Sequence, residues 1–181
     1  MAVTTPIPDL GATAPDFSLK GVDGKTYRFA DIRGTNATLV MFICNHCPYV
    51  KTIIDRLAGH VAQLQSEGVG AVAIMSNDVE TYPDDSFDNM KRFAAAHRFS
   101  FPYVIDETQD VAKAYGAVCT PDFFGYNVKD ELQFRGRLDA SRKELVAGAR
   151  PELLEAMREI AATGKGPAEQ TPSMGCSIKW R

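Results

Sequence analysis

The stretch that decides the fold is Thr38-Leu39-Val40-Met41-Phe42-Ile43-Cys44-Asn45-His46-Cys47-Pro48. Its first six residues form a largely apolar run between polar segments, which is typical of a strand buried on both faces of a sheet. Cys44 and Cys47 follow this run directly. Pro48 suits the first turn of a helix, where a residue needs no N–H. The stretch therefore predicts a strand that passes into a helix, with a CxxC pair at the corner.

The residues after Pro48 predict a long helix followed by a second strand. Apolar residues recur at helical spacing at Val50, Ile53, Ile54, Leu57, Val61 and Leu64. We expect the helix to end near Gly68, and residues 69–75 form another apolar run of strand length. A strand, a helix and a strand in one sheet imply a right-handed parallel crossover.

The remaining elements follow from the same patterns. Residues 14–29 predict two short strands around an Asp23-Gly24 turn, which is a β-hairpin. Downstream we expect a helix over 86–99, a strand over 101–105, a short helix over 111–115, antiparallel strands over 123–127 and 132–137, and a final helix over 151–162. No internal repeat or linker divides the chain, so we expect one domain over residues 1–162.

Residues 163–181 form a C-terminal tail that is rich in Gly, Pro and Ser, and we expect it to lack regular structure. Its apolar Ile178 and Trp180 favour docking onto the domain. Docking would bring Cys176 to Cys47 as a resolving thiol. The alternative is a free cysteine in a loose tail.

Composition narrows the classes of partner. The chain has 181 residues, 45% of them hydrophobic and 24% charged, which is ordinary for a globular domain. The net charge is -3 and the basic residues are spread along the chain. The sequence therefore predicts no basic surface that would bind nucleic acid or anionic lipid. The start lacks the basic and apolar regions of a leader, and no apolar run reaches about 18 residues. We therefore expect a cytoplasmic protein with neither nucleic acid nor membrane as a partner.

The CxxC pair is the chemically informative feature. Two cysteines three residues apart can close and reopen a small disulfide ring, and a helix N-terminus favours thiolate over thiol. His46 is either a second stabiliser of the thiolate or a solvated loop residue. An all-cysteine zinc site would need a second close pair, but Cys119 and Cys176 are far apart in sequence. We expect redox chemistry, with no cofactor and no resident metal.

Several motifs together resemble the thioredoxin superfamily, and more narrowly its redoxin (AhpC/TSA) branch, which includes the antioxidant peroxiredoxins. The likeness covers about residues 10–162. It rests on Ala14-Pro15-Asp16-Phe17-Ser18-Leu19 with Asp23-Gly24, the CxxC, Gly116 before Thr120-Pro121, and Phe123-Phe124. The chain is most similar to a peroxiredoxin-like subgroup that keeps a thioredoxin CxxC.

The resemblance implies a thioredoxin-like three-layer α/β fold, in which helices flank a central mixed β-sheet and a β-hairpin lies at the N-terminus. It also implies that Pro121 is cis and lies against the CxxC, so that main-chain groups there can pair with a bound peptide. From the residues alone, Thr120-Pro121 would be an ordinary turn before a strand.

The chain departs from both parent patterns. Peroxiredoxins have a Pro and a Thr before the cysteine and an Arg across the pocket, whereas here Val40 and Cys44 stand at those places and residues 116–124 contain no Arg. Thioredoxin has a buried Asp six residues before its first cysteine, where this chain has Thr38. The usual general base is therefore missing, unless His46 replaces it.

Three functions follow as hypotheses. The first is a thiol-disulfide oxidoreductase acting on protein or small-molecule disulfides with a cellular thiol reductant. Thioredoxins attack with the first cysteine, here Cys44, whereas the peroxiredoxin alignment points to Cys47. The second is a thiol peroxidase in which Cys47 reacts with peroxides and Cys44, Cys119 or Cys176 resolves the product. The third is a Cu(I) carrier, since soft thiolates beside His46 can hold that ion.

Cys119 is either a third reactive thiol close to the CxxC or a small hydrophobic residue that is buried in the core.

Overall fold

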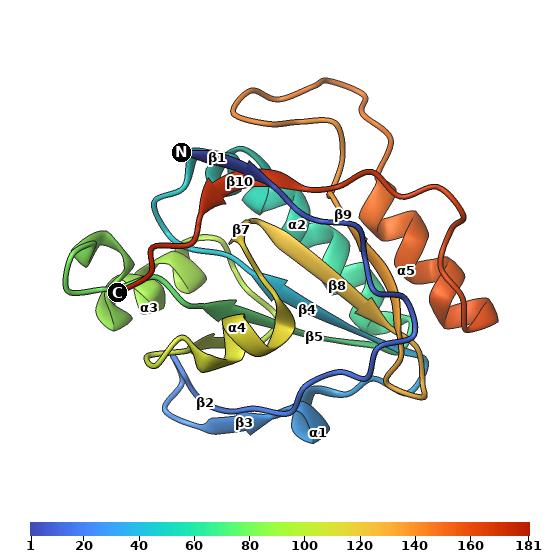
Figure 1. Ribbon diagram of the computed structural model, residues 1–181, viewed down its shortest axis with the longest axis horizontal. Helices are drawn as coiled ribbons and strands as arrows, with labels where there is room; N and C mark the ends of the chain where they lie inside the picture. The colour runs from blue at the N-terminus through green and yellow to red at the C-terminus, as the bar shows by residue number, and fades with distance from the viewer.

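A seven-stranded mixed sheet forms the centre of the protein, which is described here by a computed structural model of residues 1–181 (Figure 1). The strand order is β3-β2-β6-β5-β4-β8-β9. The strands are β2 (Ser18–Gly21), β3 (Thr26–Arg28), β4 (Ala37–Phe42), β5 (Val69–Met75), β6 (Tyr103–Ile105), β8 (Asp122–Tyr126) and β9 (Leu132–Gly136). β4, β5 and β6 are parallel, and the flanking pairs are antiparallel. The predicted mixed sheet and N-terminal hairpin are confirmed.

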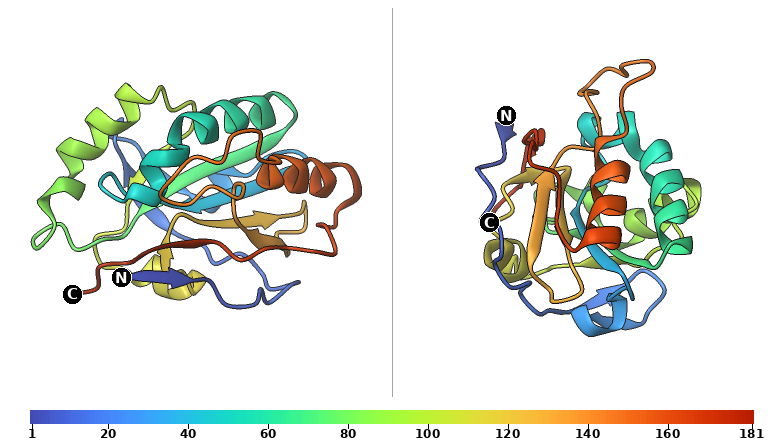
Figure 2. Two further views of the ribbon diagram at one scale, coloured as in Figure 1. Left: turned by 90° about the horizontal axis from the view of Figure 1, so that it is seen from above. Right: turned by 90° about the vertical axis from the view of Figure 1, so that its right-hand side faces the viewer.

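Helices cover both faces of this sheet and make three layers (Figure 2). The core on one face includes residues of α2 (Pro48–Ser66), α3 (Phe87–Ala96) and α5 (Glu152–Thr163). The core on the other face includes residues of α1 (Phe29–Ile32) and α4 (Asp110–Tyr115). β4 alternates between the two cores, with Leu39 in the first and Val40 in the second. Its largely apolar run is explained because both faces of the strand are buried.

α2 begins as the sequence predicts. Pro48 occupies the first helical position, Cys47 is the N-cap, and the apolar stripe from Val50 to Leu64 packs into the core. The chain leaves the helix through Gly68, which has a φ of +85°. A Cβ there would stand 2.3 Å from the side chain of Asn36, so both the backbone angle and the space require glycine. The parallel crossover from β4 to β5 is confirmed.

A second, three-stranded sheet joins the two ends of the chain to the domain. Its order is β1 (Ala2–Thr4), β10 (Met174–Ser177) and β7 (Cys119–Thr120), all antiparallel (Figure 1). The expectation of an irregular tail is therefore wrong at residues 174–177. The tail's partners lie far away in sequence, so its composition does not reveal the pairing. Docking of the tail is confirmed for Ile178, which is buried, whereas Trp180 is exposed.

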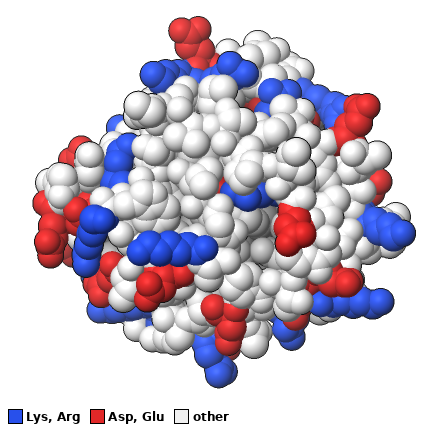
Figure 3. All heavy atoms as spheres, viewed as in Figure 1, with Lys and Arg blue, Asp and Glu red and all other residues white.

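Charged side chains on the face that carries β1 and β10 are of both signs. Figure 3 shows Lys and Arg interspersed with Asp and Glu, mostly toward the margin of this face. None of the helices combines the length and hydropathy that crossing a bilayer would require. The short helix η1 (Pro83–Asp85) lies in the segment that joins β5 to α3.

Candidate active site

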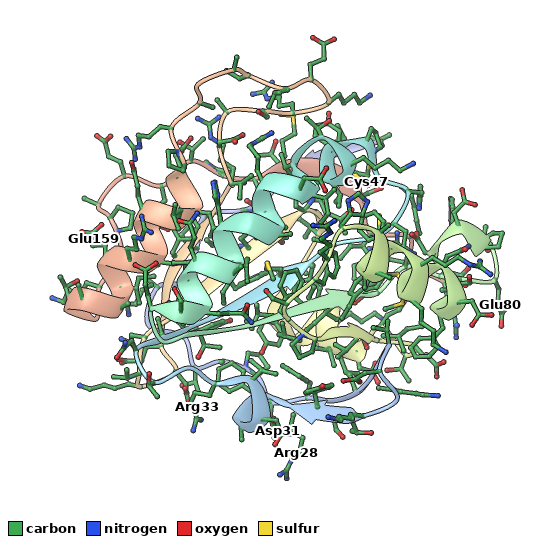
Figure 4. All side chains as sticks on the ribbon, turned by 180° about the vertical axis from the view of Figure 1, so that it is seen from behind. Arg28, Asp31, Arg33, Cys47, Glu80 and Glu159 are labelled. Atoms are coloured by element: carbon green, nitrogen blue, oxygen red, sulfur yellow. The ribbon has the colours of Figure 1, made fainter.

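Cys44 and Cys47 lie at the corner between β4 and α2. Cys47 is at the N-terminal end of α2, far from Arg28 and Asp31 at the opposite edge of the molecule (Figure 4). Helical N–H groups at this end are not all used within the helix, and the helix dipole is positive there. The backbone therefore offers a favourable place for a thiolate.

Thr120 connects both cysteines to the cis-proline loop. The Thr120-Pro121 bond is cis, as the resemblance implies. The Cys44 Sγ is 3.4 Å from the Thr120 hydroxyl, and the Cys47 Sγ is 3.3 Å from the Thr120 carbonyl oxygen. Pro121 accepts a hydrogen bond of 2.6 Å on its carbonyl from the Ser173 hydroxyl. The loop thus lies directly against the CxxC.

The two thiols have opposite electrostatic environments. A hydrogen bond from the Cys44 thiol, against the opposing effect of burial, lowers the pKa of Cys47 to about 5. The thiol and amide of Cys176 and the side chain of Thr120 add to this lowering. The same contact with Cys47, together with burial and the charge of Asp85, raises the pKa of Cys44. These opposite pKa shifts make Cys47 the first thiol of the pair to ionise, while Cys44 keeps its proton.

Asp85 is a site residue that sequence reasoning missed. Its side chain is fully buried and accepts hydrogen bonds from the Asn45 amide (2.8 Å) and from Asn77 Nδ2 (2.9 Å). The His46 Nδ1 lies 2.6 Å from the Asp85 Oδ2, although the direction is not that of a hydrogen bond. In the sequence Asp85 follows Tyr82-Pro83-Asp84, a polar stretch with nothing that links it to the CxxC.

His46 is held between this carboxylate and an aromatic ring. Its imidazole stacks on Tyr82 at a centroid distance of 5.9 Å and an interplanar angle of 4°. One ligand atom each from Cys44, His46 and Asp85 lies within 4.8 Å of the others. These three atoms are close enough together to bind one metal ion. The carboxylate of Asp85 is, however, a hard ligand, and Cu(I) prefers soft ligands. The same closeness allows proton transfer between Cys44 and the His46–Asp85 pair.

The other two cysteines occupy the second sheet. Cys176 of β10 contacts Cys47 through both its amide and its thiol. Cys119 of β7 is fully buried, burial raises its pKa, and its thiol is directed at the Pro121 carbonyl at 3.7 Å. The structure thus places Cys176 opposite Thr120, whose carbonyl the Cys47 sulfur contacts, and Cys176 adds to the lowering of the Cys47 pKa. All four cysteines carry free thiols.

Access to the CxxC is closed in this conformation. Cys44 is 1% exposed and Cys47 is 0% exposed, whereas Cys176 is partly exposed. The pair is nevertheless not isolated in apolar packing, because Thr120, Cys176 and Asp85 supply polar contacts or charge around it.

Comparison with curated proteins finds relatives among thiol-disulfide oxidoreductases. ResA of Geobacillus thermodenitrificans is 29% identical over 117 residues, which cover 64% of this chain and 62% of the relative. ResA of Halalkalibacterium halodurans is 26% identical over 122 residues, which cover 67% of this chain and 65% of the relative. The chain therefore spans less than two thirds of the length of these relatives.

Solved structures match a larger share of this chain than the two ResA proteins do. An uncharacterized conserved protein from Geobacillus kaustophilus has a TM-score of 0.94 at 44% identity, covering 100% of this chain and 97% of that one. A hypothetical protein from Sinorhizobium meliloti has a TM-score of 0.92 at 36% identity, covering 98% of each chain. A putative protein disulfide isomerase from Bacteroides thetaiotaomicron shares the thioredoxin-like fold, with a TM-score of 0.64 at 14% identity over 87% of this chain and 93% of that one.

A family model also matches most of the chain. The model of the AhpC/TSA family matches residues 10–137, a range that runs from before the hairpin to the end of β9. This range holds the CxxC, Asp85 and the cis-proline loop, and it accounts for most of the chain. The chain therefore belongs to the AhpC/TSA family.

Proposed function

We propose that the protein is a thiol-disulfide oxidoreductase whose redox pair is Cys44 and Cys47. The observation that carries the proposal is the placement of both thiols at the N-terminus of α2 against Thr120 of the cis-proline loop, with the pKa of Cys47 lowered and that of Cys44 raised. The similarity to the two ResA proteins supports the same class of reaction.

Cys47 is the attacking thiol in this proposal, because its lowered pKa keeps it ionised at neutral pH. Its thiolate attacks one sulfur of a substrate disulfide, the substrate S–S bond breaks, and one substrate thiolate leaves and takes a proton. Cys44 then loses its proton and attacks the Cys47 sulfur of the mixed disulfide. The second substrate thiolate leaves, and the Cys44–Cys47 disulfide remains. A cellular thiol reductant restores the pair.

His46 and Asp85 serve the second step. Cys44 must be deprotonated to attack, and its raised pKa makes this the demanding proton transfer. The His46–Asp85 pair lies within reach of the Cys44 sulfur and can accept the proton. In this way a carboxylate from the segment after β5 replaces the buried Asp that thioredoxins carry before the first cysteine.

Reduction of a small aromatic disulfide tests the proposal. Cys47→Ser should abolish turnover, whereas Cys44→Ser should stop the reaction with the Cys47 sulfur held in a disulfide that Cys44 can no longer resolve. The matched control is Cys119→Ala, which removes a thiol of the second sheet that does not contact Cys47 and should keep turnover. Full activity in both CxxC variants would end the proposal.

A thiol peroxidase is the second candidate. It is favoured by the lowered pKa of Cys47 and by two thiols, Cys44 and Cys176, in contact with it. The missing peroxiredoxin pocket residues weigh against it. Stopped-flow oxidation of Cys47 by hydrogen peroxide decides the matter: a rate no faster than that of a free thiol excludes the peroxidase.

A further inference from the structure

β10 occupies the edge of the cis-proline loop where the resemblance implies that a partner peptide pairs. It lies antiparallel to β7, with Cys176 opposite Thr120 and Ser177 opposite Cys119. Addition of an extended strand to an exposed edge is a common mode of peptide recognition. Here the added strand is the chain's own C-terminal segment, and a cysteine stands opposite the threonine that touches both catalytic sulfurs.

Close contacts fix the register of β10. A Cβ on Gly175 would lie 1.9 Å from the Thr120 carbonyl oxygen, so only glycine permits this approach. On one side of the strand the Ser173 hydroxyl donates to the Pro121 carbonyl. On the other side Ile178 is buried in the core, and the Lys179 amide donates to Asn77 Oδ1 at 2.9 Å. β10 is thus held at both ends, and Cys176 is presented at one defined place.

The closed CxxC leaves Cys176 as the accessible thiol. Cys44 and Cys47 are shielded, whereas Cys176 is partly exposed and contacts Cys47. The side chains of Cys176 and Met174 point to the same face of β10, because alternate residues of a strand share a face. Met174 lines a cavity of about 230 Å³ whose other walls include Pro121, Arg142 and Asp139. The cavity therefore lies beside β10, whereas β10 itself blocks the edge that a substrate peptide would need.

We propose that Cys176 is a third catalytic thiol, presented to Cys47 by β10 as a built-in substrate strand, and that it admits small disulfides to the redox pair. The inference rests on the proposed function of Cys44 and Cys47. Burial and the contact with Cys47 raise the pKa of Cys176 to about 11, so its thiol loses its proton to the leaving thiolate as it attacks a small disulfide RSSR, which releases RSH and leaves a Cys176–SR bond. The Cys47 thiolate attacks the Cys176 sulfur and releases the second RS⁻. Cys44, after losing its proton, attacks Cys47, frees Cys176 and completes the Cys44–Cys47 disulfide. RSSR has gained the two electrons that the pair has lost.

The distinctive species is a Cys47–Cys176 disulfide, which Cys44→Ser should trap. The full-length variant is treated anaerobically with one equivalent of oxidised glutathione, quenched in acid, labelled at its free thiols and mapped by peptide mass spectrometry. We expect the Cys47–Cys176 bridge as the main product, with two glutathione thiols released per chain. Glutathione bound to Cys47, with Cys176 free, would overturn the inference.

Rates in otherwise intact protein give the second measurement. Cys176→Ser should slow formation of the Cys44–Cys47 disulfide by oxidised glutathione about tenfold or more, because the accessible thiol is lost. Cys119→Ala, which removes the neighbouring thiol on β7, should leave that rate unchanged. Equal rates in wild type and Cys176→Ser would overturn the inference and leave the proposed function standing. Wild-type protein that never forms a Cys44–Cys47 disulfide would instead refute the proposed function.

Discussion

The Asp85 carboxylate lies 2.6 Å from the His46 Nδ1, on a segment that returns from β5 to the CxxC. Because Asp85 is fully buried and also accepts the Asn45 amide, it fixes the loop between the two cysteines. Asp85 is in this account the positioning and charge partner of His46, and the pair receives the proton of Cys44.

Asp85→Asn should slow resolution of the mixed disulfide about 100-fold, because general acid–base assistance is lost while the side chain keeps its size. His46→Asn should have a similar effect, and the double variant should be little worse than either. Rapid-quench kinetics of the second exchange step, followed from pH 5 to 9, provide the measurement. Tyr82→Phe keeps the ring that stacks on His46 and is the matched control. Equal pH profiles in wild type and Asp85→Asn would contradict this role.

Reduced Cys47 should titrate far below an ordinary cysteine. Because the pKa of Cys47 is lowered to about 5 by hydrogen bonds to its sulfur, thiolate absorbance at short ultraviolet wavelengths should rise with a midpoint near that value. An ordinary thiol has a midpoint of about 8.5. Cys47→Ser should remove this transition, and Cys119→Ala should keep it. A midpoint at the ordinary value would contradict the electrostatic account.

The lowered pKa of Cys47 also predicts how the stability of the reduced protein changes with pH. A group whose pKa is depressed on folding stabilises the folded state fully above its unfolded pKa, and loses this contribution as the pH falls through its folded pKa. The stability of reduced wild type relative to Cys47→Ser should therefore increase from pH 5 to pH 9. Urea unfolding under a thiol reductant at several pH values measures the difference. A constant difference over this window would show that Cys47 is not ionised in the folded protein.

Gly175→Ala should open the site without unfolding the domain. The added Cβ would overlap the Thr120 carbonyl oxygen, so β10 must shift away from β7. We expect Cys47 to react faster with a small alkylating reagent in the native protein. Gly59→Ala in α2 is the control, because a Cβ there meets nothing within 4 Å and should stabilise the helix by about 0.5–1 kcal/mol. Unchanged labelling of Cys47 in Gly175→Ala would mean that β10 does not limit access.

The interior of α2 should be sensitive to loss of volume. Leu57 is fully buried in the core that joins α2 to the sheet. Leu57→Ala should lower the free energy of unfolding by about 2–5 kcal/mol, through lost burial and the cavity left behind. Urea denaturation measures this loss, with Gly59→Ala again as the surface control. A loss below about 1 kcal/mol would contradict the packing described for this face.

Local sequence patterns predicted the part of the fold that positions the CxxC. The run over 38–43, the helical spacing after Pro48 and the strand over 69–75 could be recognised because burial on two faces and helical period are visible within short windows. The cis-proline loop followed from the family resemblance. Thr120-Pro121 alone looks like any turn before a strand.

The features that the sequence did not predict depend on contacts between distant segments. β1 and β10 are short strands whose pairing depends on each other and on β7, so no window of the tail contains the information. Asp85 likewise acquires its role only when residues 76–86 fold back onto the CxxC. The docking of Ile178 was predicted from its apolar character, but the strand that places Cys176 against Cys47 was not.

In the proposed function, Cys44 and Cys47 exchange two electrons as one redox pair. Wild-type protein equilibrated anaerobically over a series of reduced and oxidised glutathione ratios, then labelled and mapped by mass spectrometry, tests it most directly. We expect both thiols to disappear together, in a two-electron transition to a Cys44–Cys47 disulfide. Two thiols that stay reduced throughout, or that take up glutathione independently, would contradict it.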